Sequence, residues 1–378
     1  RRHAGPHRRP RPVNAPRTSG QAGIPSQPGP SEPGSAEGPA TAGDPQASVL
    51  AGYDPYARGA LRPFGFSPQA RLSLLSLSEN ATYRVEDPAD GRIGALRVHR
   101  TGYHPPRGVA SELAWLQALR RDEGLLTPAV FRAIDGREIV DIEIGQRTRQ
   151  CVLFEFLPGS EPASDELEGK FELLGGISAR MHRHARGWQR PAWFNRFRWD
   201  FDCCVGATPR WGRWQDGVGV GAEETAVLSR AAALIGERLR RFGTGPERFG
   251  LIHADMRLAN LLVNGPDIQV IDFDDCGFGW FLFDLGAALS FLEHDPRVPA
   301  LCAAWVRGYR RELTLPAADA AEIPTFILLR RLQLVAWVGS HAFADAAREL
   351  GADFTHGACE LAERYLAAAT PSAIRSED

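Results

Sequence analysis

Lysine is almost missing from this chain. Lys170 is the single lysine among 44 Lys and Arg residues. A P-loop requires lysine followed by Ser or Thr, whereas Lys170 precedes Phe171, so a P-loop is excluded. The same scarcity disfavours a lysine Schiff-base mechanism. The nearest dinucleotide fingerprint, at residues 217–222, follows a polar Trp-rich stretch instead of a strand, and we interpret it as a loop.

Metal-binding and disulfide patterns are missing too. The six cysteines include one adjacent pair and no Cys-x-x-Cys, which fits neither a zinc site nor a dense disulfide framework. A reduced, cytoplasmic setting is the simplest expectation. His182 and His184 stand two apart on a predicted helix and therefore point to different faces, which makes them a poor metal pair.

Long apolar runs are also missing, so we expect no membrane segment and no signal peptide. Residues 1–50 are rich in Arg, Pro, Gly, Ser and Ala and lack aromatics, and we predict that they and residues 371–378 are disordered. Six arginines against three acids make the first tail basic. A solvated tail explains this better than an anionic partner, and no nucleic-acid partner is expected.

The remaining pattern predicts an α+β protein of two lobes. In residues 51–157, short segments in which apolar and polar residues alternate predict a small antiparallel sheet. One helix is predicted at Ser111–Leu119, with Ser111 as its N-cap. Residues 158–370 are mainly helical. Strands are predicted near 71–77, 82–85, 94–99, 129–134, 138–143 and 149–156. Helices are predicted at 171–184, 222–242, 283–293, 298–313, 323–350 and 356–369.

The most informative stretch runs from His253 to Asp272. It reads His-x-Asp-x4-Asn and then, after an apolar run, a second Asp, which is the spacing of a kinase catalytic loop. One carboxylate can orient or deprotonate a hydroxyl, while the amide and the second carboxylate can hold magnesium against nucleotide phosphates. Asn264-Gly265 predicts a tight turn, so the stretch should form a β-hairpin with polar ends. A surface hairpin with merely solvated acids is the weaker explanation.

These residues resemble the aminoglycoside phosphotransferase superfamily, which includes choline kinase, type II homoserine kinase and stress-response kinases. Residues 251–263 and 270–277 carry most of the resemblance, and 174–182 and 283–289 fit it too. The resemblance covers residues 71–370. It implies the protein-kinase fold, with a small antiparallel β lobe that binds nucleotide and a large, mainly helical lobe.

The resemblance also implies roles for individual residues. Asp255 corresponds to the catalytic base, and Asn260 and Asp272 correspond to the ligands of Mg²⁺, which prefers hard oxygen donors. Asp284 corresponds to a buried acid that braces the catalytic loop. His253 is expected to brace the loop as well, with a general-base role as its alternative.

The small lobe departs from the protein-kinase pattern, because it has neither a glycine-rich loop nor a strand lysine. Ser78 and Asn80, in the turn before Thr82, would cover the phosphates instead. Arg97 stands at the lysine position, with Glu112 as its expected partner. Arginine keeps the charge and binds phosphate through a planar fork. The alternatives are a solvated strand cation and an ordinary helix-surface acid.

Three further residues are candidates. Glu155 and Leu157, where the last strand ends in Pro158-Gly159, are expected to offer backbone hydrogen bonds to adenine. The alternative there is a plain connection between lobes. Arg257 has two possible roles: it contacts the transferred phosphate, or it forms an ion pair with Asp274 or Asp275.

We therefore predict an ATP-dependent phosphotransferase, with GTP as the open alternative to ATP, that uses Mg²⁺ and phosphorylates a hydroxyl of a small molecule. Amino sugars, amino alcohols and hydroxy amino acids are the candidate acceptors. Asp274 and Asp275 are expected to line the acceptor pocket, and helical spacing lets one of Arg330 and Arg331 face it. A stress-response-type Ser/Thr protein kinase and a non-catalytic nucleotide-binding protein are the alternatives, and the oligomeric state is left open.

Overall fold

The computed structural model of the chain describes residues 49–78, 80–342 and 344–369. Most of the predicted disordered tails, residues 1–48 and 371–378, lies outside the described residues. Val49 and Leu50 end the first predicted tail, yet they pack against the core of the small lobe. The boundary of that prediction was therefore about two residues too late.

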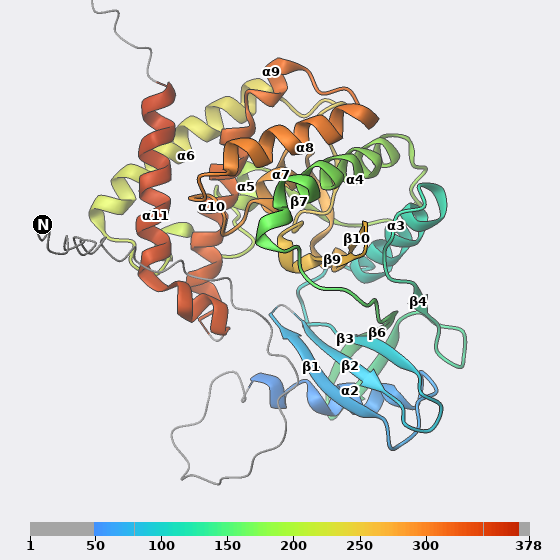
Figure 1. Cartoon of the computed structure of the whole chain (residues 1–378). Coiled ribbons are helices and arrows are strands. Elements are labelled where there is room, and N and C mark those ends of the chain that lie inside the picture. The colour runs from blue at the N-terminus through green and yellow to red at the C-terminus, as the bar shows by residue number, and fades with distance from the viewer. Residues whose placement is uncertain (1–48, 79, 343, 370–378) are drawn as a thin grey trace, which may run out of the picture. The chain divides into compact units, whose positions relative to one another are not determined.

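The small lobe is built on a six-stranded antiparallel sheet with the order β1-β2-β3-β6-β4, and β5 pairs with β6 (Figure 1). Its residues alternate between buried and less buried positions along β2, as expected for a strand with one face on a core. The strands are β1 (Arg71–Leu77), β2 (Ala81–Glu86), β3 (Ile93–Val98), β4 (Val130–Phe131), β5 (Val140–Ile144) and β6 (Arg147–Glu155).

Two helices pack against this sheet, whereas the sequence predicted one. The helix that was missed, α2 (Asp54–Leu61), buries Tyr56, Ala57 and Leu61 in a core shared with the sheet. It was missed because it is only eight residues long and Gly59 weakens the helical signal in its interior, although Pro55 in the first turn is compatible with a helix start. The second helix, α3 (Gly108–Asp122), lies between the sheet and the large lobe in Figure 1, and its apolar residues belong to the core of the large lobe.

The predicted cap of α3 is wrong. The helix begins at Gly108, after Arg107 in a left-handed conformation, so Ser111 lies inside its first turn. The buried Ser111 hydroxyl accepts a hydrogen bond from the Asn195 backbone N–H at 2.8 Å. Ser111 thus joins two segments far apart in the chain instead of capping a helix.

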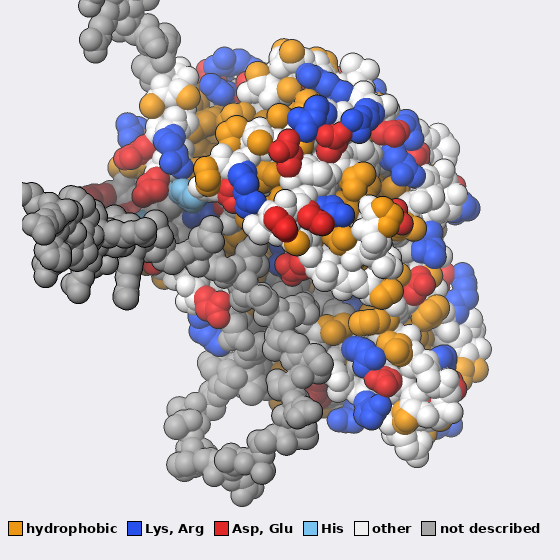
Figure 2. Space-filling view, viewed as in Figure 1, with side chains coloured by type: hydrophobic (Ala, Val, Ile, Leu, Met, Phe, Trp, Pro, Cys, Tyr) orange, Lys and Arg blue, Asp and Glu red, His pale blue; other side chains and the backbone are white. Residues whose placement is uncertain are grey.

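The large lobe is mainly helical (Figure 1). Its closest helix pair is α4 and α8, where Gly175 and Gly308 let the two backbones approach each other. Figure 2 shows acidic and basic side chains interspersed over the outer face of this lobe. The helices are α4 (Leu167–Gly187), α5 (Phe201–Cys204), α6 (Ala222–Phe242), α7 (Phe283–Ala288), α8 (Val298–Glu312), α9 (Ala317–Ala320), α10 (Ile323–Ser340) and α11 (Asp345–Ala369).

The predicted helix over 323–350 is wrong at its end. α10 ends at Ser340, and α11 follows with a break at Gly351, where φ is +49°. The predicted helix over 283–293 is also too long, since α7 ends at Ala288. Within the described ranges, no helix combines the length and the apolar character that a bilayer crossing requires. All six cysteines are free.

Two small sheets in the large lobe carry the His253–Asp272 stretch. β8 (Phe249–Ile252) pairs with β11 (Gly277–Trp280), which also pairs with β7 (Phe197–Trp199). β9 (Leu261–Asn264) and β10 (Asp267–Val270) form the predicted hairpin, with Gly265 in a left-handed conformation. Ser160, beyond the end of β6, exchanges backbone hydrogen bonds with Val263 of β9, at 3.2 and 2.7 Å.

Candidate active site

The loop that follows β8 is held in an uncommon conformation by one buried carboxylate. Ala254 has φ +69°, a left-handed value that alanine seldom adopts. Asp284, at the start of α7, is fully buried and accepts hydrogen bonds from the backbone N–H of Ala254 at 2.8 Å and of His253 at 3.2 Å. His182 of α4 contacts the same carboxylate at 3.0 Å. Asp284 thus fixes the backbone immediately before Asp255.

His253 is occupied on both ring nitrogens. Nε2 lies 3.1 Å from the carbonyl oxygen of Ile271, and Nδ1 accepts the backbone N–H of Asp255 at 3.3 Å. This pattern requires the neutral tautomer with hydrogen on Nε2. The ring therefore joins the Asp255 segment to the Asp272 segment and leaves no nitrogen for a substrate, which opposes its alternative role as a general base.

Asp255 is surrounded by donors. Its Oδ2 accepts from Asn260 Nδ2 at 2.8 Å and from Arg257 Nε at 3.2 Å, and its Oδ1 accepts from Arg330 Nη2 at 2.5 Å. Burial raises the pKa of this carboxyl, but the positive charges of Arg330 and Arg257 outweigh burial, so the pKa is lowered from its ordinary value. Asp255 is therefore ionised at neutral pH and can accept a further hydrogen bond.

Asn260 and Asp272 lie next to each other, since the backbone N–H of Ile271 donates to the carbonyl oxygen of Asn260 at 3.0 Å. Asn260 donates from Nδ2 to Asp255. Its amide oxygen, the atom that a cation prefers, is not used in these hydrogen bonds. Asp272 has a left-handed φ of +61°, and its side chain is 44% exposed. Although this side chain is partly exposed, the protein around its carboxyl displaces water, and Asp274 and Asp255 add negative charge nearby, so its pKa is raised despite Arg97. Like-charge repulsion at an oxygen-rich site is what a divalent cation relieves.

Arg97 joins the sheet to the large lobe. Its Nη2 donates to Glu112 of α3 at 2.7 Å, and its Nη1 lies 3.0 Å from Asp274 and 3.4 Å from Asp272. The Arg97–Glu112 pair that the sequence predicted is therefore present, and both side chains are almost fully buried. Burial raises the pKa of Glu112, and the Arg97 charge opposes that rise. The Arg97 guanidinium therefore ends next to Asp272, the candidate metal ligand.

The position of Asp274 opposes its expected place in an acceptor pocket. It is buried, and its Oδ1 accepts from Arg97 and lies 2.9 Å from His104 Nε2. Burial raises the pKa of Asp274, but His104, His99 and Arg97 outweigh it and hold the pKa well below its ordinary range. His99 and His104 lie close enough to Asp274 to suggest a metal group. Arg97 already donates to that carboxylate, which argues for a polar link between lobes instead.

Arg196 completes this link and has no counterpart in the sequence prediction. Its guanidinium donates to the backbone oxygens of Asp274, Cys276 and Gly108 and approaches His104 Nδ1 at 3.4 Å. It is one of several arginines in a Trp- and Arg-rich stretch, so no spacing signal distinguishes it from its neighbours. Only the close approach of the Asp274 segment and α3 in space gives it a role.

The small-lobe residues that were predicted to contact nucleotide differ in how deeply they are buried and in what they contact. The Asn80 side chain is buried, and its Oδ1 accepts the backbone N–H of Arg100 at 3.0 Å, so it anchors the loop from inside. That position opposes a direct phosphate contact from Asn80 Oδ1. The backbone N–H of Ser78 donates to the carbonyl oxygen of Asn80 at 3.0 Å. Glu155 ends β6 and receives the Ala129 N–H on its carboxylate at 3.1 Å, and Leu157 is half-buried two residues further on.

The two adjacent arginines of α10 point in different directions, as helical spacing predicted. Arg330 reaches Asp255, whereas Arg331 pairs with Glu293 at 3.0 Å and stacks on Phe354. Arg257 pairs with Asp255 and not, among the described contacts, with Asp274 or Asp275. The active-site carboxylate is thus bounded by a cation from its own loop and a second from a distant helix.

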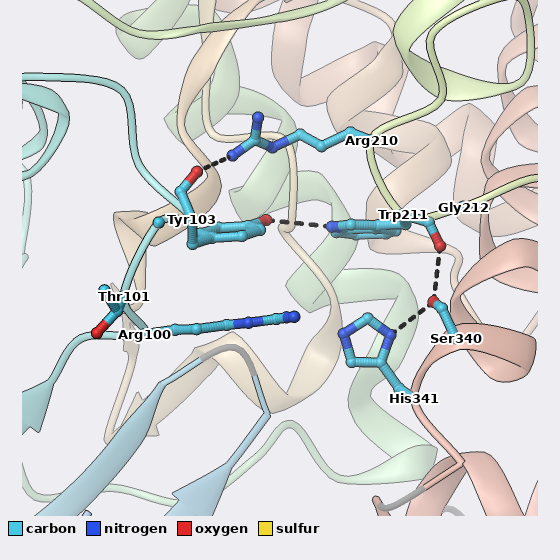
Figure 3. Close-up of a pocket in the computed structure, with 9 residues that line it drawn as sticks. Arg100, Thr101, Tyr103, Arg210, Trp211, Gly212, Ser340 and His341 are labelled. Atoms are coloured by element: carbon cyan, nitrogen blue, oxygen red, sulfur yellow. Dashed lines mark hydrogen bonds between the residues drawn. The ribbon is translucent and has the colours of Figure 1, made fainter.

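A pocket of about 350 Å³, lined in part by Tyr103 and Trp211, lies beside the residues that surround Asp255 (Figure 3). The indole of Trp211 donates to the Tyr103 hydroxyl at 3.1 Å, and that hydroxyl donates to Asp275 at 2.5 Å. Figure 3 shows the two rings lying edge to edge as one wall, with Arg100 and His341 across from them. Trp211 also contacts the Arg330 guanidinium, 5.1 Å from the ring centroid. Trp211 therefore both lines the pocket and contacts the arginine that binds Asp255.

Comparison with known proteins decides the family. The model of the phosphotransferase enzyme family (APH) matches residues 72–321. The chain belongs to this family. The resemblance and the two-lobe fold class predicted from the sequence are thereby confirmed.

Two relatives stand out for this phosphotransferase. The solved structure of a microcompartment-associated aminopropanol kinase is 50% identical, covers 83% of this chain and 98% of that chain, and superposes with a TM-score of 0.77. Amicoumacin kinase of Bacillus subtilis (strain 168) is 26% identical over 282 residues, which are 71% of this chain and 80% of the relative.

A more distant structure supports the fold alone. Amicoumacin kinase hAmiN, solved with AMP-PNP, Ca²⁺ and its ligand Ami, is 22% identical with a TM-score of 0.69 over 86% of this chain and 97% of that chain. The family match and the two relatives described before it show an ATP-dependent phosphotransferase that acts on a small-molecule hydroxyl, as the sequence predicted.

Proposed function

We propose that this phosphotransferase transfers the γ-phosphoryl group of ATP to the hydroxyl of a small amino alcohol of the aminopropanol type. The 50% identity to an aminopropanol kinase, over nearly all of that chain, supports this acceptor class. The observation that carries the chemistry is the cluster of Asp255, Asn260 and Asp272, joined by the Asn260 contacts to Asp255 and to Ile271.

The roles in this proposal follow from the site geometry. Asp255 accepts the proton of the acceptor hydroxyl. Asn260 and Asp272 hold Mg²⁺, which neutralises the nucleotide phosphates when bound. Arg97, fixed by Glu112, is directed at a phosphate. Amicoumacin kinase hAmiN, which shares the fold, was solved in complex with AMP-PNP and Ca²⁺, and we propose a similar pairing of nucleotide and divalent ion here.

We place the small lobe of this enzyme at residues 49–157 and the large lobe at residues 158–369. The end of β6 at Glu155 and the pairing of Ser160 with the hairpin support that boundary. Ser78 and the backbone of Glu155 and Leu157 remain our predicted nucleotide contacts. Asp284 and His253 remain the predicted braces of the loop, and the cytoplasmic location also stays a prediction.

The test is a coupled assay of ADP release with ATP and Mg²⁺ over aminopropanol, ethanolamine, an amino sugar and homoserine. GTP is run as a second donor. The highest kcat/KM is expected for the amino alcohols. Homoserine tests a carboxylate-bearing acceptor, which the Arg330 cation beside Asp255 would favour. If only homoserine were phosphorylated, the acceptor class proposed here would be wrong.

Asp255→Asn is the matched catalytic test. Loss of the proton acceptor should lower kcat by about 100-fold or more, while the KM for ATP stays near that of the wild type. Asp267→Asn, an exposed acid at the hairpin turn, is the control and should retain full turnover. Near-normal turnover by Asp255→Asn would remove Asp255 from its proposed role.

A further inference from the structure

Three donors already occupy Asp255. An ionised carboxylate offers about four acceptor positions, two on each oxygen. Asn260 and Arg257 both donate to Oδ2, at 2.8 and 3.2 Å, whereas Arg330 alone donates to Oδ1, at 2.5 Å. Oδ1 therefore keeps one acceptor position among the described contacts, beside the guanidinium of Arg330.

Arg330 is fixed on almost every side. Its Nε donates to Ser290 Oγ at 3.1 Å, and its Nη1 donates to Gln333 Oε1 at 3.2 Å and to the Ala254 carbonyl at 3.4 Å. The guanidinium lies between the rings of Trp211 and Phe283, and the side chain is 2% exposed.

A guanidinium carries five N–H groups. Within the described part of the chain, the second N–H of Nη2 is the one for which no acceptor is found. It belongs to the nitrogen that contacts Asp255 Oδ1. A vacant acceptor and a donor therefore lie side by side at one edge of the Arg330–Asp255 pair.

We propose that this edge binds the hydroxyl of the acceptor, and that Arg330 is an acceptor-orienting residue. The hydroxyl donates its hydrogen to Asp255 Oδ1 and accepts from Arg330 Nη2. Its remaining lone pair is then directed at the γ-phosphorus. The oxygen–phosphorus bond forms as the bond to the β–γ bridging oxygen breaks; ADP leaves with that oxygen, and the proton ends on Asp255 Oδ1. This assignment rests on the proposed function.

The neighbouring arginine provides a matched control. Arg331 lies on the same helix and is buried, but it pairs with Glu293 and Phe354, away from Asp255. Lysine keeps the charge of either arginine and loses the planar fork. An effect found for Arg330→Lys and not for Arg331→Lys therefore reports on the orientation of the Arg330 fork.

The experiment measures kcat, the KM for ATP and the KM for the acceptor in the wild type, Arg330→Lys and Arg331→Lys. The acceptor is the compound that gives the highest kcat/KM in the assay described under the proposed function. For Arg330→Lys, kcat/KM for the acceptor should fall about 10–100-fold, because the hydroxyl is no longer oriented. The KM for ATP and the unfolding midpoint should stay close to those of the wild type. Arg331→Lys should keep kcat/KM within about twofold.

Two results would overturn the proposal. One is an unchanged kcat/KM in Arg330→Lys. The other is a parallel loss of ATP affinity, acceptor affinity and stability, which would give Arg330 a purely structural part. If the wild type phosphorylated none of the amino alcohols but another hydroxyl compound, the proposed acceptor class would fail while the Arg330 test could still be run on that compound.

Discussion

Single residues decide whether the catalytic loop keeps its shape, and Asp284 is the clearest case. One buried carboxylate receives two backbone N–H groups and His182. An amide at this position would direct hydrogen atoms at some of those donors. Asp284→Asn is therefore expected to lower the free energy of unfolding by about 3–5 kcal/mol. Urea unfolding measures the change, with Asp267→Asn as the control; a loss below about 1 kcal/mol would show that the brace contributes little to stability.

A second prediction at this scale concerns pH. Burial lowers the pKa of His99 from 6.5 to about 4. The unfolded chain then binds a proton at a higher pH than the folded protein does. Stability from this group is complete above pH 6.5 and is lost as the pH falls toward 4, by up to about 3 kcal/mol. His99→Leu should therefore flatten the fall of the urea midpoint over this range.

His356, an exposed histidine of α11, is the control for that experiment. His356→Leu should keep the acid sensitivity of the wild type. An equal slope in wild type and His99→Leu would mean that His99 is protonated in the folded protein across this range.

Sequence reasoning selected some of these residues and missed others for a physical reason. Asp255, Asn260 and Asp272 share one short motif, so their spacing alone indicated a site. Arg196 and His104 acquire their contacts only when distant segments meet, and no local pattern distinguishes them from other surface candidates. The buried position of Asp274 was not predicted, because a polar residue after a motif looks the same whether it faces a pocket or a buried cation.

At the scale of elements, the α4–α8 pair yields a sharp prediction. A Cβ at Gly175 would overlap the backbone oxygen of Trp305 in α8, whereas one at Gly169, also on α4, would meet nothing within 4 Å. Gly175→Ala should therefore destabilise the protein by about 1–3 kcal/mol. Gly169→Ala should be neutral or stabilising by up to about 1 kcal/mol. Thermal unfolding of the two variants measures both; equal midpoints would mean that the helices separate at little cost.

The helices also show how far sequence periodicity reaches. The bounds of α6 were predicted at Ala222–Phe242, because the helix is amphipathic and has Gly243 just beyond its end. The break between α10 and α11, after Ser340, was missed because apolar residues continue across it and the nearest glycine, Gly351, lies within α11. Periodicity therefore placed α6 accurately but set the ends of α7 and α10 too late.

For the whole molecule, ligand binding should stabilise the folded enzyme. A non-hydrolysable ATP analogue with Mg²⁺ at 100 times its Kd should add about 2.7 kcal/mol to the free energy of unfolding. Asp272→Asn should remove the part of this gain that depends on Mg²⁺, because a neutral amide binds the ion more weakly. Thermal shift with and without Mg²⁺ measures the difference; an unchanged Mg²⁺ dependence would exclude Asp272 as a ligand.

The two-lobe architecture was predictable as a whole, since a β-rich half and a helical half follow each other in the chain. The contacts that join the halves were not predictable in the same way. Arg97, Asp274 and Tyr103 link the sheet side to the catalytic side through partners about 170 residues apart in sequence. Such pairs depend on the final packing and leave no periodic trace.

The bond pair between Ser160 and Val263 has a consequence for nucleotide exchange. From Ser160 onward the connecting chain is part of the hairpin's own sheet, and β6 has already ended at Glu155. We therefore expect any movement of the sheet relative to the hairpin to use rotation about Phe156–Gly159. Asn260, at the base of the same hairpin, would keep its place relative to Val263 during that movement. Under the proposed function, ADP release would then depend on this rotation, whereas the acceptor side of the hairpin would not.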